Sequence, residues 1–279
     1  MFLGLIGAAI ARHVTRGTGR AAAITFCVVV AIATVRAIHP LNPRVPRGFG
    51  GPEAKRLRLE VVDAAKEALL SEDGQVAHAG AQRLMVAMER AAVEGDGETA
   101  AYWRVVLGVY RQAQTATAEC ELEGERFASM GGADWSSVTG PADLEARLRS
   151  IEALRRALQE VNDAREHLPA AVDDGLRRAG VPADARRQYL EGMGGVAATR
   201  MREVGRLDVL ILGICREQAR LLHANFGRWT LREDGALMFQ DEAVGQAFVR
   251  LCRESEKAGR EREQAQREFL EATRQALAR

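Results

Sequence analysis

Residues 21–35 form an uncharged stretch, AAAITFCVVVAIATV, with Arg20 before it and Arg36 after it. A helix that crosses a bilayer needs about 20 predominantly apolar residues, and about 17 is the lower limit. The stretch is shorter than this, but its flanking arginines can extend to the membrane interface, and residues 37–38 lengthen the apolar run. We therefore predict a single transmembrane anchor over residues 21–38, which makes a membrane the first expected partner.

Three other interpretations of this stretch stay open. A cleaved signal peptide would need a basic start, an apolar core and a small-residue cleavage site, and residues 35–37 make a poor site. A buried core helix is disfavoured by the β-branched run at 28–30 and by the absence of acidic residues nearby. An organelle transit peptide is disfavoured because the first residues of the chain contain little serine.

Positive charge flanks the stretch on both sides, with Arg12, Arg16 and Arg20 before it and Arg36, Arg44 and Arg47 after it. The charge balance that sets membrane orientation is therefore close to even. A short tail with three arginines and no acid is unfavourable to translocate. We expect it to stay in the cytoplasm of a bacterium, so that a single-pass protein of the cytoplasmic (inner) membrane would hold its main domain outside the cytoplasm.

The 279 residues divide into four parts by composition. A short apolar and basic tail (1–20) precedes the anchor (21–38), and residues 39–52 hold four of the seven prolines and form a linker. Residues 53–279 form the main domain, with a possible subdivision near 131–140. This domain has 33 basic and 38 acidic residues, and its net charge of −5 excludes the basic surface of a nucleic-acid-binding protein.

Apolar residues recur at helical spacing through most of the main domain. They predict helices over about 53–70, 75–94, 98–130, 141–168, 183–191 and 196–225, and a last helix over 241–277. We expect Pro169 to interrupt the helix before it, because proline lacks an N–H and clashes with the preceding turn. In the last helix, a seam of mostly apolar or small residues runs at heptad spacing from Val244 to Ala276 and includes Arg262.

Residues 226–240 give the clearest β signal, centred on the turn pair Asp234-Gly235. A three-residue loop over 233–235 would place Trp229, Leu231, Leu237 and Phe239 on one face, whereas a two-residue loop would divide them between two faces. We predict the three-residue loop, with helices covering the apolar face. The predicted fold is all-α: a transmembrane helix, a Pro/Gly linker, and an elongated helical bundle with a long antiparallel helical hairpin capped by a small β-hairpin.

The four cysteines are too sparse for a disulfide scaffold and include no CxxC pair. Cys215 lies 19 residues before Asp234 and Cys252 lies 18 residues after it, so the two are nearly level in the predicted helical hairpin. We predict that they can form a disulfide in an oxidising compartment, with two reduced core cysteines as the alternative.

The sequence contains no P-loop, no GxSxG elbow and no HExxH motif, and its five histidines are scattered. We therefore expect no cofactor, no metal and no catalytic activity. Trp135, in a glycine-flanked loop, and Trp229 and Phe239, at the β-hairpin, are candidate anchors for a partner, because aromatic residues contribute disproportionately to binding. For Trp229 and Phe239, core packing is the preferred alternative.

These features favour a membrane-anchored helical interaction or scaffold protein of the bacterial envelope, which binds a protein partner or self-associates. The alternative is an extracytoplasmic ligand-sensing or ligand-binding helical domain, with a pocket expected near residues 192–195. A secreted helical protein, released by signal-peptide cleavage, also stays open. An enzyme with an unfamiliar helical site is the least favoured hypothesis.

Overall fold

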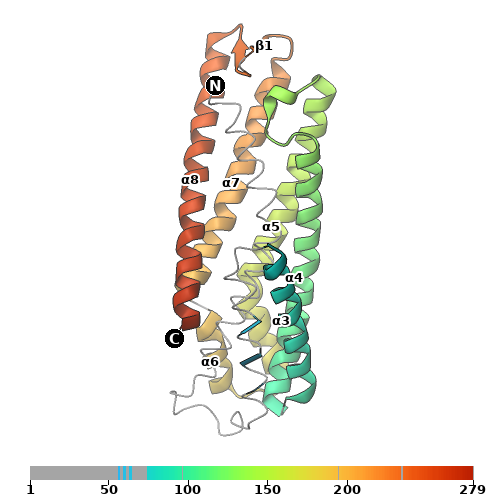
Figure 1. Cartoon of the computed structure of the whole chain (residues 1–279), viewed down its shortest axis with the longest axis vertical. Coiled ribbons are helices and arrows are strands. Elements are labelled where there is room, and N and C mark those ends of the chain that lie inside the picture. Colours follow the sequence, from blue (N-terminus) through green and yellow to red (C-terminus); the bar gives the residue numbers. More distant parts are fainter. Residues whose placement is uncertain are drawn as a thin grey trace. The chain divides into compact units, whose positions relative to one another are not determined.

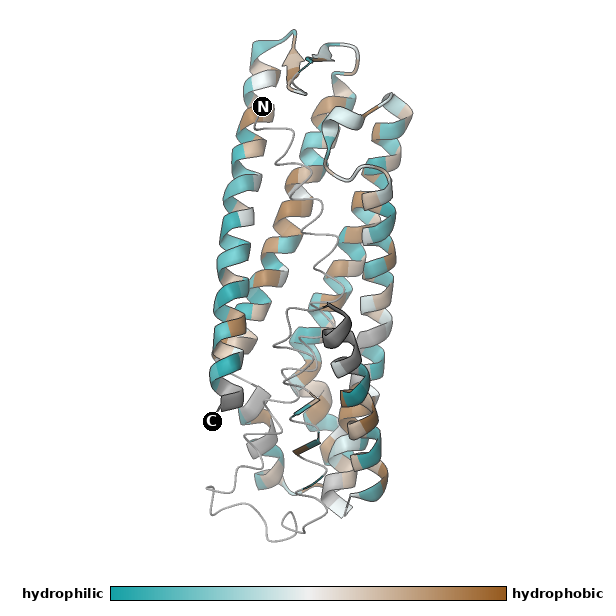
Figure 2. Cartoon of the chain, viewed as in Figure 1, coloured by the Kyte–Doolittle hydropathy of each residue, from teal (hydrophilic) through white to brown (hydrophobic). Residues whose placement is uncertain are grey.

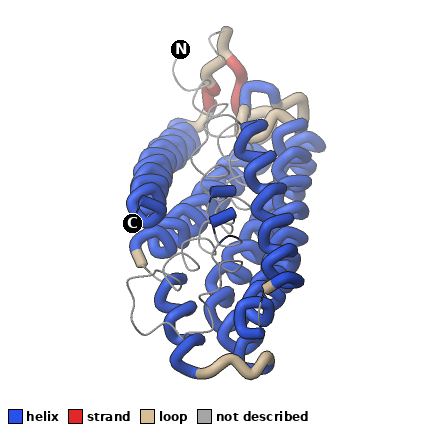
Figure 3. Tube along the Cα trace, turned by 60° about the horizontal axis from the view of Figure 1, so that its bottom comes forward, coloured by secondary structure: helices blue, strands red, loops and turns tan. Residues whose placement is uncertain are grey.

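The computed structural model describes residues 56, 59–60, 63–64, 74–95, 97–193, 195–233 and 235–278. Helix predominates in these ranges, and strand occurs in them only as one small hairpin (Figure 3). Nowhere in these ranges does a helix combine the length and the hydrophobicity that a bilayer crossing requires. The predicted anchor (21–38) and linker (39–52) lie outside the described residues.

The order of the elements confirms the helical fold with an inserted hairpin (Figure 1). The elements are α3 (Gly74–Glu94), α4 (Gly97–Ser129), the short 3-10 helix η2 (Trp135–Ser137), α5 (Pro141–Arg178), α6 (Ala183–Met193), α7 (Val196–Ala224), β1 (Trp229–Leu231), β2 (Leu237–Phe239) and α8 (Glu242–Ala278).

The predicted interruption at Pro169 is wrong, because α5 continues through this proline to Arg178. An interior proline costs a helix about 3 kcal/mol. Leu168, Val172 and Leu176 recur at helical spacing around it and are all buried, whereas Pro169 itself is exposed. Burial of this apolar stripe outweighs the lost hydrogen bond, so the helix persists.

The described residues form two compact units. Unit 1 contains residues 116–162 and 203–265, and unit 2 contains the described parts of 56–115, 163–202 and 266–278. The loop at 131–140 lies within unit 1. In unit 2, Tyr102 and Trp103 pack edge to face with ring centroids 5.1 Å apart, and the buried residues Leu84, Met88 and Leu176 belong to the same unit.

In unit 1, α7 and α8 run antiparallel beside each other, and the β-hairpin joins them at one end (Figure 1). Two contacts define their register. Arg262 donates to the Asp208 carboxylate at 2.5 Å with both side chains buried, and Gln218 donates to the Cys252 sulfur at 3.4 Å. Each pair is symmetric about Gly235, because Asp208 and Arg262 lie 27 residues from it and Gln218 and Cys252 lie 17 residues from it. The predicted antiparallel helical hairpin is therefore confirmed in this unit.

The predicted heptad seam of α8 is confirmed in part within unit 1, since Val244 and Leu251 are only half-buried. Phe248, Ser255, Ala258, Arg262 and Ala265 are all buried. Figure 2 shows a band of hydrophobic residues along α7 and a mostly hydrophilic α8, as expected for a helix with one narrow apolar seam.

The strand register confirms the three-residue hairpin loop. Trp229 pairs with Phe239 and Leu231 pairs with Leu237, and the Arg232 N–H donates to the Ala236 carbonyl at 2.9 Å. Residues 233–235 therefore connect the strands, and Gly235 has the left-handed conformation, with φ of 79°. Asp234 lies outside the described residues. The pairing puts all four predicted apolar side chains on one face of the hairpin.

Candidate functional site: an apolar pocket beside the hairpin

A buried arginine fixes the loop between α4 and α5. Arg147 has only 2% of its side chain exposed and lies one helical turn after Asp143, with which it forms an ion pair at 3.2 Å. Its guanidinium also donates to the carbonyls of Gly132 and Asp134, at 3.2 and 2.7 Å, and to the Ser137 hydroxyl at 2.9 Å. These bonds give a short loop one conformation, because a buried guanidinium needs many acceptors.

This loop presents Trp135 to the paired helices α7 and α8. The Trp135 indole is buried, and its N–H donates to the Gln218 side-chain oxygen at 3.1 Å. The amide nitrogen of Gln218 in turn donates to the sulfur of Cys252. One chain of hydrogen bonds thus joins the loop to α7 and α8, with the Arg147 guanidinium 5.9 Å from the centre of the Trp135 ring.

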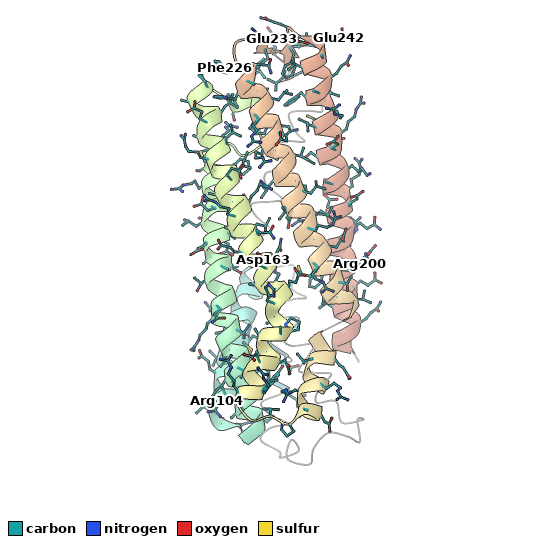
Figure 4. All side chains as sticks on the ribbon, turned by 180° about the vertical axis from the view of Figure 1, so that it is seen from behind. Arg104, Asp163, Arg200, Phe226, Glu233 and Glu242 are labelled. Atoms are coloured by element: carbon teal, nitrogen blue, oxygen red, sulfur yellow. The ribbon has the colours of Figure 1, made fainter. Side chains whose placement is uncertain are left out.

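The β-hairpin supplies the opposite wall. The rings of Phe239 and Phe248 pack with centroids 5.3 Å apart, which holds β2 against the start of α8. Figure 4 shows this end of unit 1, where the labelled residues Phe226, Glu233 and Glu242 gather around the hairpin.

Between these walls lies a pocket of about 690 Å³. This volume is in the range of about 300–1,000 Å³ that is typical of small-molecule sites. Apolar groups predominate in its lining, which includes Trp135, Leu237, Met238, Phe239, Phe248 and Val249. Such a pocket can hold an apolar molecule against its walls.

Charged groups line the pocket as well, and acidic ones are in excess. They are Asp134, Asp241, Glu242 and Glu256, against Arg250 and Arg253. Most of these groups have local structural partners. Asp134 and Asp241 cap the starts of η2 and α8, Glu242 accepts from Gln246, and Arg250 pairs with Glu254 at 4.0 Å.

Two thiols border the pocket, and both are protonated at neutral pH. Burial, together with repulsion from Cys252, raises the pKa of Cys215 to about 12. Burial also raises the pKa of Cys252 to about 11, although the hydrogen bond from Gln218 acts in the opposite direction. Because the thiolate is the reactive form of cysteine, neither group is an activated nucleophile.

Both thiols are free in this structure. The register of α7 and α8 places Cys252 level with Gln218, and Cys215 lies three residues from that level, or about 4.5 Å along the helix axis. The sequence-based count was centred on Asp234, whereas the helix contacts are symmetric about Gly235. The Cys215–Cys252 disulfide stays a prediction for an oxidising compartment.

The structure brings together four of the five residues that the sequence singled out. Trp135, Phe239, Cys215 and Cys252 all line the pocket. Trp229 does not; its indole N–H donates to the Leu222 carbonyl at 3.0 Å, and its ring packs edge to face on Phe226.

Sequence reasoning missed Arg147 and Gln218. The spacing of Asp143 and Arg147, four residues apart at the start of a helix, was an available signal for the first. Gln218 stands at heptad spacing with Ile211, Cys215 and Leu222, so a polar group inside the α7 seam was also visible in the sequence.

The pocket is lined by residues beside the hairpin, and residues 192–195, where the sequence suggested a pocket, are not among them. Gly195, with φ of 108°, instead lies between the end of α6 and the start of α7. Within the described ranges, no group of three or more His, Cys, Asp or Glu side chains is arranged to hold a metal ion.

No protein-family model, curated protein or solved structure matches this chain. The chemistry of the pocket is therefore the basis for a functional proposal.

Proposed function

We propose that this protein is a non-catalytic helical binding protein that holds a small apolar molecule in the pocket beside its β-hairpin. The observation that carries the proposal is the pocket itself, with its volume of about 690 Å³ and its largely apolar lining. The apolar lining of a pocket of this size is in contact with water, which is unfavourable in free energy. A bound apolar ligand would cover this surface and so be stabilised.

Binding is favoured over catalysis because several of the polar groups around the pocket have structural roles. Asp241 caps α8, and Gln218 joins Trp135 to Cys252. Two protonated thiols offer no activated nucleophile.

The proposal includes membrane attachment. Residues 21–38 would anchor the protein in the bacterial cytoplasmic membrane, and residues 53–279 would lie on its outer side. The support is the apolar sequence, its flanking arginines and the proline-rich linker behind it. Release of the domain after signal-peptide cleavage is the alternative, and it would leave the binding site unchanged.

A protein partner at the same end of unit 1 is a second candidate function. Phe226, Leu231 and Met238 are 43%, 47% and 50% exposed around the hairpin. Clustered exposed apolar residues often mark interaction surfaces. Most of the α8 seam in unit 1, by contrast, is already buried in the single chain, so that part of the seam offers little surface for self-association.

Site-specific NMR tests the proposal. Met238 lines the pocket, and its methyl signal can be followed in methionine-labelled protein in lipid nanodiscs and identified with Met238→Leu. Naphthalene is the apolar probe, and we expect a saturable shift of this signal in the wild type. Val249→Trp should weaken naphthalene binding at least tenfold, because the larger ring fills space at the pocket wall.

Val86→Trp is the matched control, since Val86 is an exposed helical valine that does not line the pocket. It should bind naphthalene as the wild type does. A Met238 signal that shifts without saturation, or that responds equally in Val249→Trp, would contradict the proposal.

A further inference from the structure

Gln218 is one of the polar residues that line the pocket, and only 4% of it is exposed. The oxygen of its side-chain amide accepts from the Trp135 indole. The nitrogen has two hydrogens, and among the described residues its partner is the Cys252 sulfur, at 3.4 Å.

A thiol sulfur is a weak acceptor, so this donor is poorly satisfied. A buried donor with a poor partner favours any ligand that offers a better one. A carbonyl or ether oxygen of a molecule in the pocket would accept from the Gln218 nitrogen in place of the sulfur.

The rings of the lining indicate the body of such a ligand. Trp135, Phe239 and Phe248 all contribute to the walls. Aromatic side chains pack well on flat aromatic groups, in offset or edge-to-face arrangements.

The charges of the lining indicate that the ligand is not an acid. Four carboxylates and two guanidinium groups line the pocket, and Arg250 already pairs with Glu254. A carboxylate ligand would lose hydration and meet a net negative lining, whereas a neutral oxygen loses less hydration and is not repelled by these carboxylates.

We infer that the pocket selects a neutral molecule with an aromatic body and a hydrogen-bond-accepting oxygen, which Gln218 recognises. This inference rests on the proposed function, because it names the class of ligand that the same pocket would hold.

The test compares two ligands of nearly equal shape in the full-length protein in nanodiscs. Acetylnaphthalene carries a carbonyl oxygen and ethylnaphthalene does not. The Met238 methyl signal gives the Kd of each, and the ratio of the two Kd values is the preference for the oxygen. We expect Gln218→Met to reduce this preference by roughly 2- to 10-fold, the effect of one hydrogen bond. Partition of each ligand into lipid is the same for both proteins and cancels in this comparison.

A second variant covers the case in which Gln218→Met disturbs the Trp135 loop. Cys252→Ala leaves the Gln218 amide in place and removes its sulfur acceptor. The preference for acetylnaphthalene should then increase, because the ligand no longer competes with sulfur. A preference that stays the same or falls would show that the carbonyl does not use this amide.

The outcomes separate the inference from the proposed function. If both ligands saturate the Met238 shift but Gln218→Met leaves the preference unchanged, the inference is wrong and the binding function stands. If neither ligand gives a saturable shift with folded protein, both are wrong. If naphthoate binds and Arg253→Gln weakens it tenfold relative to acetylnaphthalene, the ligand is an acid, and the inference is overturned.

Discussion

At the scale of single residues, the loop between α4 and α5 depends on one guanidinium. Arg147 bonds to two backbone carbonyls, a hydroxyl and a carboxylate, and it is almost fully buried. Removing a buried hydrogen-bonding group leaves its partners without water or protein to bond to, which costs more than the bonds contributed. The position of Trp135 depends on these bonds, since they hold the loop residues before and after Trp135 in the chain.

We predict that Arg147→Met lowers the free energy of unfolding by about 2–4 kcal/mol. Arg149→Met is the matched control, because Arg149 is on the same helix, is 73% exposed and reaches Glu145 only at 3.8 Å. It should change stability by less than about 0.5 kcal/mol. Urea unfolding followed by circular dichroism measures both. Equal effects of the two substitutions would show that the buried bonds do not support the loop.

The sequence indicates some of these residues more clearly than others. Gln218 and Asp208 both stand at heptad spacing along α7, so polar groups within a buried seam could be expected. The residues of α8 that bond to them could not be predicted, because the residues that face each other depend on the register of the two helices. The contacts between α7 and α8 are symmetric about Gly235 and not about Asp234. This difference of one residue is enough to place Gln218, and not Cys215, opposite Cys252.

At the scale of elements, the β-hairpin was the most predictable feature. Alternation of apolar residues excluded a two-residue loop, and the observed register agrees with the three-residue loop. The continuation of α5 was less predictable, because local sequence rules describe the cost of Pro169 but not the burial of Leu168, Val172 and Leu176 around it. The pocket was not predictable at all, since it forms where a loop, a hairpin and two helices meet.

Two glycines should respond in opposite directions to the same substitution. Gly235→Ala forces an L side chain into the left-handed conformation, with φ of 79°, and we expect a loss of about 1 kcal/mol in unfolding free energy. Gly259→Ala, inside α8, meets no atom within 4 Å, and we expect a gain of about 0.5–1 kcal/mol. Thermal and urea unfolding of the two variants measure this difference. A stabilising Gly235→Ala would contradict the loop conformation.

At the scale of the whole molecule, positive and negative charge are unevenly distributed between the apolar stretch at 21–38 with its flanks and the main domain. The main domain has a net charge of −5, and the arginines of residues 1–52 concentrate positive charge around the apolar stretch. If the stretch spans a membrane, the proline-rich residues 39–52 connect the helical domain to that membrane. Apolar ligands partition into lipid, so this arrangement would keep the protein at the membrane where such ligands are concentrated.

We predict that the intact protein, of 30.4 kDa, stays in the membrane fraction after alkaline carbonate extraction. Val29→Asp together with Ile32→Asp should release it, because each aspartate at the centre of a span costs about 2.5–3.5 kcal/mol on insertion. Val29→Leu with Ile32→Leu is the control and should remain in the membrane. Mass spectrometry of the membrane fraction decides whether the segment is cleaved, since a signal peptide would leave a smaller protein.

Orientation follows from reporters fused at residue 50 and at the carboxyl terminus. A reporter that is active only outside the cytoplasm should give signal at both positions, because three arginines precede the stretch and a tail with that charge is held in the cytoplasm. Activity of a reporter that works only in the cytoplasm would reverse the orientation. The pocket would then face the cytoplasm, and the thiols of Cys215 and Cys252 would remain reduced there, which removes the setting in which their disulfide is predicted.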